Sequence, residues 1–210
     1  MANKVQMPEN DLMVETKGKL ELFFDKYGNK VLWALVGVTV VAVLAFAWYS
    51  YSSRSNEAKE AAAEIARVNV LGGAEEYAAV VTEFKGTKSA NLSAVMAAAA
   101  YLEAGDLTSA KEYIALYEAC EGGIGEIING MVYTLKGDIA VEENDLQSAV
   151  VEYQKALEAS DDEYTYTTAL RKLALVYEAM GNGEKAQELY KAALVKYPAN
   201  AQSYTKYIKE

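Results

Sequence analysis

The fold is decided by residues 167–200, which read TTALRKLALVYEAMGNGEKAQELYKAALVKYPAN. Apolar residues recur at helical spacing on both sides of the run Gly181-Asn182-Gly183, which favours a turn. The chain has only two prolines, Pro8 and Pro198, so little interrupts helix between them. We therefore predict an all-α protein in which this segment forms two helices joined by a short turn.

Small and large side chains are paired across the two predicted helices. Ala174 allows a close approach of the helices, and the ring of Tyr190 fills the space between them. This arrangement fits the 34-residue tetratricopeptide pattern, and one such pair cannot bury its apolar face without neighbouring copies. The predicted packing residues are Leu173, Ala174 and Tyr177 in the first helix and Ala186, Tyr190, Ala193 and Leu194 in the second.

A second copy of the pattern covers residues 130–163. Gly137 takes the close-contact position, Asn144-Asp145 form the turn, and a tyrosine follows at the large position. The close contacts of the two copies are 37 residues apart, and we place the three extra residues in a link, Asp161-Asp162-Glu163, where an insertion leaves the packing intact. The second helix of this copy is expected to pack through Ala149, Tyr153, Ala156 and Leu157.

Weaker signals extend the array towards both ends. Residues 91–123 form a degenerate copy, with Ala98, Tyr101 and Ala110 in register and with Ile114, Tyr117 and Glu118 departing from the pattern. Before it, residues 58–70 and 74–84 are predicted to be two helices broken at Gly72-Gly73. The last ten residues, AQSYTKYIKE, are expected to form a polar capping helix, which the end of a solenoid requires.

A transmembrane helix is predicted at residues 31–51. No charge occurs between Lys30 and Arg54, and the 19 residues from Val31 to Tyr49 would span about 28 Å as a helix, close to the thickness of the bilayer core. Aromatic residues flank both ends, as is typical of membrane interfaces. A cleaved signal peptide is the alternative, because Ala45-Phe46-Ala47 fits a cleavage pattern; the long acidic leader and the long apolar run favour an anchor.

The expected topology follows from the positive charges. Lys17, Lys19, Lys26 and Lys30 precede the span, against Arg54 and Lys59 after it, so the N-terminus is predicted to face the cytoplasm. We divide the chain into a cytoplasmic segment (1–30), the span (31–51) and a repeat domain (52–210). Leu12–Tyr27 is expected to lie on the membrane surface as a helix, with a partner-binding helix as the alternative.

Composition excludes several classes of function. Residues from Arg54 onward hold 15 basic and 25 acidic side chains, which disfavours binding to nucleic acid. The chain has no histidine and one cysteine, Cys120, predicted to be a small packing residue at the end of a helix. Gly122-Gly123-Ile124-Gly125 lacks the lysine of a phosphate loop and is expected to be a helix–helix turn. We predict no catalytic residue, no cofactor and no metal site.

The first helix of each repeat is expected to line a concave face that binds other proteins. Spacing of three or four residues selects the candidates, with Arg171 and Leu175 preferred. Tyr164 and Tyr166, near the inserted link, are further candidates for exposed contacts. The predicted binding residues are Met131, Thr134, Asp138, Val141 and Glu142 in the second copy and Thr168, Arg171, Leu175 and Glu178 in the clearest one.

Three segments resemble one known family. FFDKYGNKVLW (23–33) leads into the span, EYAAVVTEFKGTKSANLSAVMAAAAYLEAGDLTSA (76–110) covers the first repeats, and LKGDIAVEENDLQSAVVEYQKAL (135–157) covers a later one. From Leu20 onward the chain is similar to the YfgM-like family of tetratricopeptide-like ancillary subunits of the SecYEG translocon.

The resemblance implies a bacterial inner-membrane protein whose repeat domain lies in the periplasm. Its implied partners are the SecYEG translocon, a membrane-anchored periplasmic chaperone of the prolyl-isomerase type, and exported proteins. Two alternatives stay open. The chain could be a scaffold for an unrelated envelope complex, or a eukaryotic organelle receptor with its repeats in the cytosol, which requires the opposite orientation.

Overall fold

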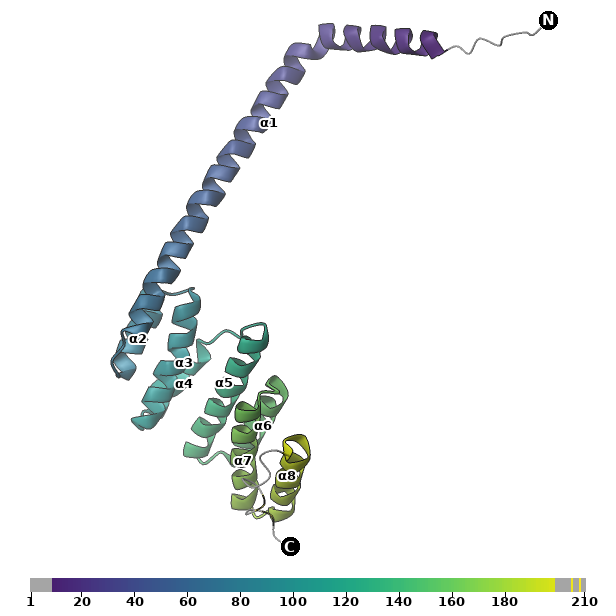
Figure 1. Cartoon of the computed structure of the whole chain (residues 1–210). Coiled ribbons are helices and arrows are strands. Elements are labelled where there is room, and N and C mark those ends of the chain that lie inside the picture. The colour runs from purple at the N-terminus through teal and green to yellow at the C-terminus, as the bar shows by residue number, and fades with distance from the viewer. Residues whose placement is uncertain (1–8, 199–204, 206–207, 209–210) are drawn as a thin grey trace, which may run out of the picture. The chain divides into compact units, whose positions relative to one another are not determined.

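The structure is a computed structural model that describes residues 9–198, 205 and 208. In this part of the chain the regular structure is helical and contains no strand (Figure 1), which confirms the all-α prediction. The chain divides into two compact units, Met1–Glu57 and Ala58–Glu210. The helices are α1 (Glu9–Val68), α2 (Ala74–Glu83), α3 (Lys88–Glu103), α4 (Leu107–Ala115), α5 (Gly123–Glu142), α6 (Leu146–Ala159), α7 (Glu163–Ala179) and α8 (Gly183–Lys196).

The first unit carries the candidate membrane span. The part of α1 from Val36 to Val68 contains a window that is long and apolar enough to cross a bilayer, with a mean hydropathy of 1.4 and none of the window buried. Trp33, Phe46 and Trp48 are more than 70 % exposed, which suits side chains that face lipid. The segment Leu12–Tyr27 is helical within α1, and its position on the membrane surface stays a prediction.

The second unit begins with the end of α1, which a short turn connects to α2. The predicted break falls at Gly72, whose φ of 138° favours glycine. The Glu60 carboxylate accepts hydrogen bonds from the backbone N–H groups of Lys88 (2.8 Å) and Ser89 (2.9 Å) in the first turn of α3. An anion at this position satisfies N–H groups that have no partner within the helix. These bonds therefore fix the end of α1 to the start of α3.

Three helix pairs follow: α3 with α4, α5 with α6, and α7 with α8. Gly137 faces the ring of Tyr153, where an added Cβ would lie only 2.5 Å from Cδ1. Ala174 and Tyr190, at the corresponding positions of the last pair, are both fully buried. The predicted contact of a small residue with a large ring is confirmed in both clear repeats.

The degenerate repeat keeps the same geometry with a different side chain. Ile114, sixteen residues after Ala98, occupies the position that tyrosine fills elsewhere. It is buried in one apolar cluster with Ala98, Ala110, Val132 and Ile139. Ile114 therefore differs from the pattern only in residue type, because its branched aliphatic side chain fills the space that a tyrosine ring fills in the other repeats.

The boundaries of the middle repeats differ from the prediction. Helix α4 ends at Ala115, and α5 begins at Gly123, seven residues before the expected start of that copy at Gly130. Residues 116–122 therefore form the connector, and Gly122, with a φ of 85°, precedes the first turn of α5. The predicted turn at residues 122–125 is wrong in position because Gly123 to Gly125 are already helical.

The acidic link has a specific role at the start of α7. Asp162 is the N-cap residue, and its carboxylate accepts hydrogen bonds from the backbone N–H and the hydroxyl of Thr165, both at 2.9 Å. Those bonds hold the pKa of Asp162 below its usual value. Asp145, Asp106 and Asn182 cap α6, α4 and α8 in the same way. The predicted capping helix at 201–210 lies outside the described residues, except for Thr205 and Ile208.

Replacing Asp162 by asparagine should alter the pH dependence of stability. Because the pKa is lowered in the folded state, the carboxylate stabilises the fold above the unfolded-state value of 3.8, and this contribution is lost as the pH falls through the folded value. Asparagine keeps an N-cap acceptor at every pH. The difference in Tm between wild type and Asp162→Asn should therefore shrink, or reverse in favour of the variant, below pH 3.8. A constant difference from pH 6 to pH 3 would contradict this assignment.

Candidate protein-binding face

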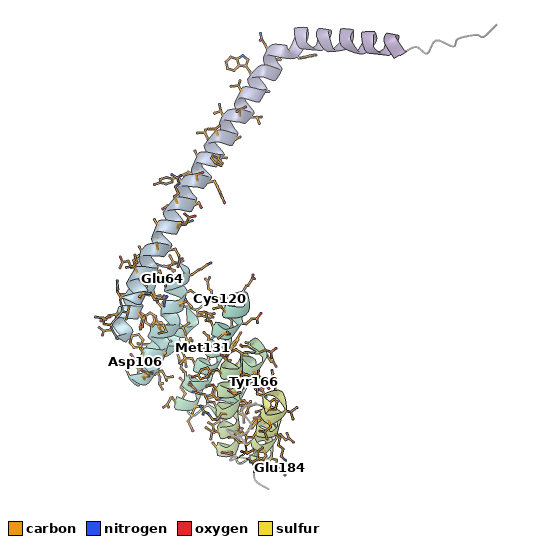
Figure 2. The ribbon with its side chains drawn as sticks, in the orientation of Figure 1. Glu64, Asp106, Cys120, Met131, Tyr166 and Glu184 are labelled. Atoms are coloured by element: carbon orange, nitrogen blue, oxygen red, sulfur yellow. The ribbon has the colours of Figure 1, made fainter. Side chains whose placement is uncertain are left out.

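The candidate face is formed by α5 and α7, the first helices of two successive pairs, which contact each other directly. Met131 and Leu175 are both 51 % exposed although they are large and apolar. Met131 is visible near the middle of the repeats in Figure 2. Three charged candidates are also exposed: Glu142, Arg171 and Glu178. The face thus combines apolar side chains with acids and one arginine, and we call these five residues the α5–α7 face.

Other predicted members of the face take part in packing. Thr134 is buried, and its hydroxyl donates a 2.9 Å hydrogen bond to the carbonyl of Gly130. Val141 is partly buried against the apolar cluster to which α5, α6, α7 and α8 all contribute. Thr168 is half-buried. Thr134 therefore does not present its side chain to solvent, whereas a contact role for the five exposed residues stays a prediction.

Asp138 belongs to a polar network that joins three helices. Its carboxylate accepts a 2.7 Å hydrogen bond from the Tyr153 hydroxyl and binds the Lys172 ammonium at 2.6 Å. Burial raises the pKa of Tyr153, and the nearby carboxylate raises it further, so the phenol stays protonated and remains a donor. Asp138 thus ties α5 to α6 and α7. Analysis of the sequence missed Lys172, although an acid and a lysine 34 residues apart could have indicated facing positions in neighbouring repeats.

Two asparagines fix the connector at residues 116–122. Asn91 of α3 forms a pair of hydrogen bonds with the backbone of Glu118, at 2.7 and 2.8 Å. Asn129 of α5 accepts from the Tyr117 hydroxyl (2.7 Å) and the Cys120 N–H (3.1 Å), and donates to the Cys120 carbonyl (2.8 Å). Cys120 therefore lies in this connector, labelled in Figure 2, and not at a helix end as predicted. Tyr117 departs from the repeat pattern because its hydroxyl serves this network, whereas Glu118 contributes only its backbone groups.

Replacing Asn129 by alanine should lower the free energy of unfolding by about 2–3 kcal/mol. The substitution removes three hydrogen bonds, and each leaves a part-buried polar partner unsatisfied. Chemical denaturation gives the measurement. Gln147→Ala is the matched control, since this amide is exposed on α6 and its loss should change stability by less than about 0.5 kcal/mol. Equal effects of the two substitutions would show that the network contributes nothing.

The two tyrosines near the inserted link differ in exposure. Tyr164 is 74 % exposed. Tyr166 is half-buried, its ring packs edge-on against Tyr197 at 5.5 Å, and the Lys196 ammonium lies 3.8 Å from the ring centroid. Tyr166 is therefore part of the packing between α7 and the end of α8, whereas Tyr164 presents its ring to solvent.

Within the described residues, no three His, Cys, Asp or Glu side chains are placed to hold a metal ion. The short α4 leaves a groove of about 650 Å³ beside the connector. Its lining combines small side chains such as Ala90 and Ala94 with Lys85, Lys88 and Leu116. The side chains that line this groove do not bring together a nucleophile and a base.

Comparisons with known proteins give one family match, which lies at the C-terminal end of the chain. A family model described as tetratricopeptide repeat matches residues 167–209. The solved structure described as "Crystal structure of MamA" aligns with a TM-score of 0.47 and 19 % identity, covering 64 % of this chain and 81 % of that one. No curated protein sequence matches the chain significantly. The matched segment contains most of α7 and all of α8. Repeats of this type stack with their neighbours to build extended binding surfaces for other proteins.

Proposed function

We propose that this protein is a membrane-anchored scaffold that binds other proteins through the α5–α7 face and catalyses no reaction. The observation that carries this proposal is the exposure of Met131 and Leu175, each about half open to solvent on the first helices of stacked pairs. Large apolar side chains surrounded by charges are typical of protein-binding surfaces.

The anchor in this proposal is the span at residues 31–51, with the N-terminal segment 1–30 in the cytoplasm and the repeat domain 52–210 on the opposite side. Its support is the uncharged run in α1, whose side chains between Val36 and Tyr49 are exposed, and the excess of lysine before the span. In bacteria this topology places the repeats in the periplasm, at the inner membrane.

The proposed partners come from the resemblance of three sequence segments to ancillary SecYEG translocon subunits. They are the translocon itself, a membrane-anchored periplasmic chaperone of the prolyl-isomerase type, and newly exported proteins. The geometry of the face fits such a role, because a stacked array of helices offers a broad surface and needs no enclosed pocket.

Site-specific crosslinking tests the proposed partners. A photoreactive amino acid at position 171 or 175 of the full-length protein should capture translocon subunits and a periplasmic chaperone, identified by mass spectrometry after mild-detergent purification. Position 195 on α8 is the control, since Val195 is 83 % exposed but lies on a second helix. Specific capture of components of an unrelated envelope complex would support the scaffold function but refute the proposed role in protein export. Equal capture of partners from positions 175 and 195 would refute the proposal that the α5–α7 face is the binding surface.

A further inference from the structure

The end of α1 carries an apolar stripe that the described residues of the repeat domain leave uncovered. Ile65 is 63 % exposed, Val68 is 65 % exposed, and Leu71, just after the helix, is 96 % exposed. Ala58 and Ala61, one and two turns earlier, are also exposed. The end of a solenoid normally presents a polar surface to water, so an uncovered stripe at this end calls for a partner.

Ile65, in the middle of the stripe, lies on the side of α1 opposite to Ala63, whereas Val68 is four residues after Glu64 and borders the contacts with α3. Ala63 is fully buried, and Glu64 receives hydrogen bonds from Ser89 (2.7 Å) and from its neighbour Arg67. Ile65 is two positions from both Ala63 and Arg67, which places it about 160° away around the helix. Figure 2 shows Glu64 where α1 meets the first repeat helices. A partner centred on Ile65 can therefore bind without displacing the hydrogen bonds between Glu60 and α3.

The spacing of the stripe is that of a two-helix seam. Ala58, Ala61, Ile65 and Val68 alternate by three and four residues, as do the a and d positions of a coiled coil. In that register the e positions are Ala62 and Asn69, and the g positions are Glu57 and Glu64. A parallel pair would place each glutamate opposite an uncharged residue, so that no like charges meet across the seam.

The geometry points to a second copy of this chain as the occupant, with the two α1 helices packed in parallel along residues 58–68. The charge pattern permits self-pairing, and identical anchors hold two copies in the same orientation in one bilayer. A seam of eleven residues, 58–68, is short, and confinement to the membrane raises the effective concentration that such a seam needs.

Disulfide crosslinking in native membranes tests this pairing. Cysteine is placed at position 65 or 68 of the full-length chain, in a Cys120→Ser background that removes the only native thiol. Mild oxidation should give at least five times more covalent dimer from Val68→Cys than from Val195→Cys, a valine that is 83 % exposed on α8. Adding Val68→Asp to the Ile65→Cys chain should remove most of its dimer, and adding Val195→Asp instead should not.

Two results would overturn the inference: dimer yields from positions 65 and 68 no higher than from 195, or disulfides from these positions to a different protein only. Circular dichroism of each variant shows whether the repeats are folded, so that loss of dimer is not confused with unfolding. The pairing rests on the anchor proposed above, and extraction of the same membranes at alkaline pH reports on the anchor separately. A chain that resists extraction and gives no dimer disproves the pairing alone.

Discussion

Replacing Tyr153 by alanine should lower the free energy of unfolding by about 3–5 kcal/mol, the range for removing a buried aromatic side chain. The ring is 2 % exposed and fills the space that Gly137 leaves open on α5. Its hydroxyl also donates to Asp138 at 2.7 Å, so the substitution removes both a large packing element and one bond of the network that joins α5, α6 and α7.

Chemical denaturation of the wild type, Tyr153→Ala and Tyr153→Phe separates the two contributions. The phenylalanine variant keeps the ring and should lose only about 1–2 kcal/mol, since the hydrogen bond to a charged carboxylate is removed. A phenylalanine variant as unstable as the alanine variant would show that the network dominates. An alanine variant that loses less than about 1 kcal/mol would contradict the packing described for this repeat.

Replacing Gly137 by valine should destabilise the protein by about 3 kcal/mol or more, near or above the upper end of the usual cost of overpacking a core. An added Cβ would lie 2.8 Å from Cζ of Tyr153, and the ring cannot move away because its hydroxyl is bound to Asp138. The extra γ-carbons of valine worsen this clash. Glycine is therefore required here for space, although it lowers helix propensity.

A double-mutant cycle tests the cause of that loss. In a Tyr153→Leu background the ring is absent, so Gly137→Val should lower the free energy of unfolding by at least about 1.5 kcal/mol less than it does in the wild type. This difference is within the range of interaction energies found for residues in contact. Gly123→Val is a useful comparison, because an added Cβ at Gly123 would meet nothing within 4 Å. Equal costs of Gly137→Val in both backgrounds would show that the two residues do not compete for space.

The helix pairs were predictable because each depends on a local pattern. A small residue, a turn and a large residue recur at fixed spacing, and backbone geometry converts that spacing into contact wherever it occurs. Gly137, Ala174 and Tyr190 were identified for this reason. The start of α5 was not predictable in the same way, because the extra two turns of helix, from Gly123, depend on a connector whose bonds come from Asn91 and Asn129.

The candidate face was predictable only in part. Equivalent positions in two repeats were assigned the same environment, but Thr134 is buried and Arg171, at the same position in the next repeat, is exposed. Among the described helices, α7 packs against α5, whereas no later first helix packs against α7. The Asp138–Lys172 pair was missed since its two members belong to different repeats, and no pattern within one repeat shows it.

The most direct test of the protein-binding face is the amount of partner that copurifies with a chain altered at its two exposed apolar residues. Met131→Glu and Leu175→Glu are combined in the full-length protein, and Val151→Glu with Val195→Glu, on the exposed sides of α6 and α8, form the control. With equal folding shown by circular dichroism, partner recovery should fall at least five-fold for the first pair and stay within two-fold of wild type for the control. Unchanged recovery from the Met131 and Leu175 chain would contradict the account.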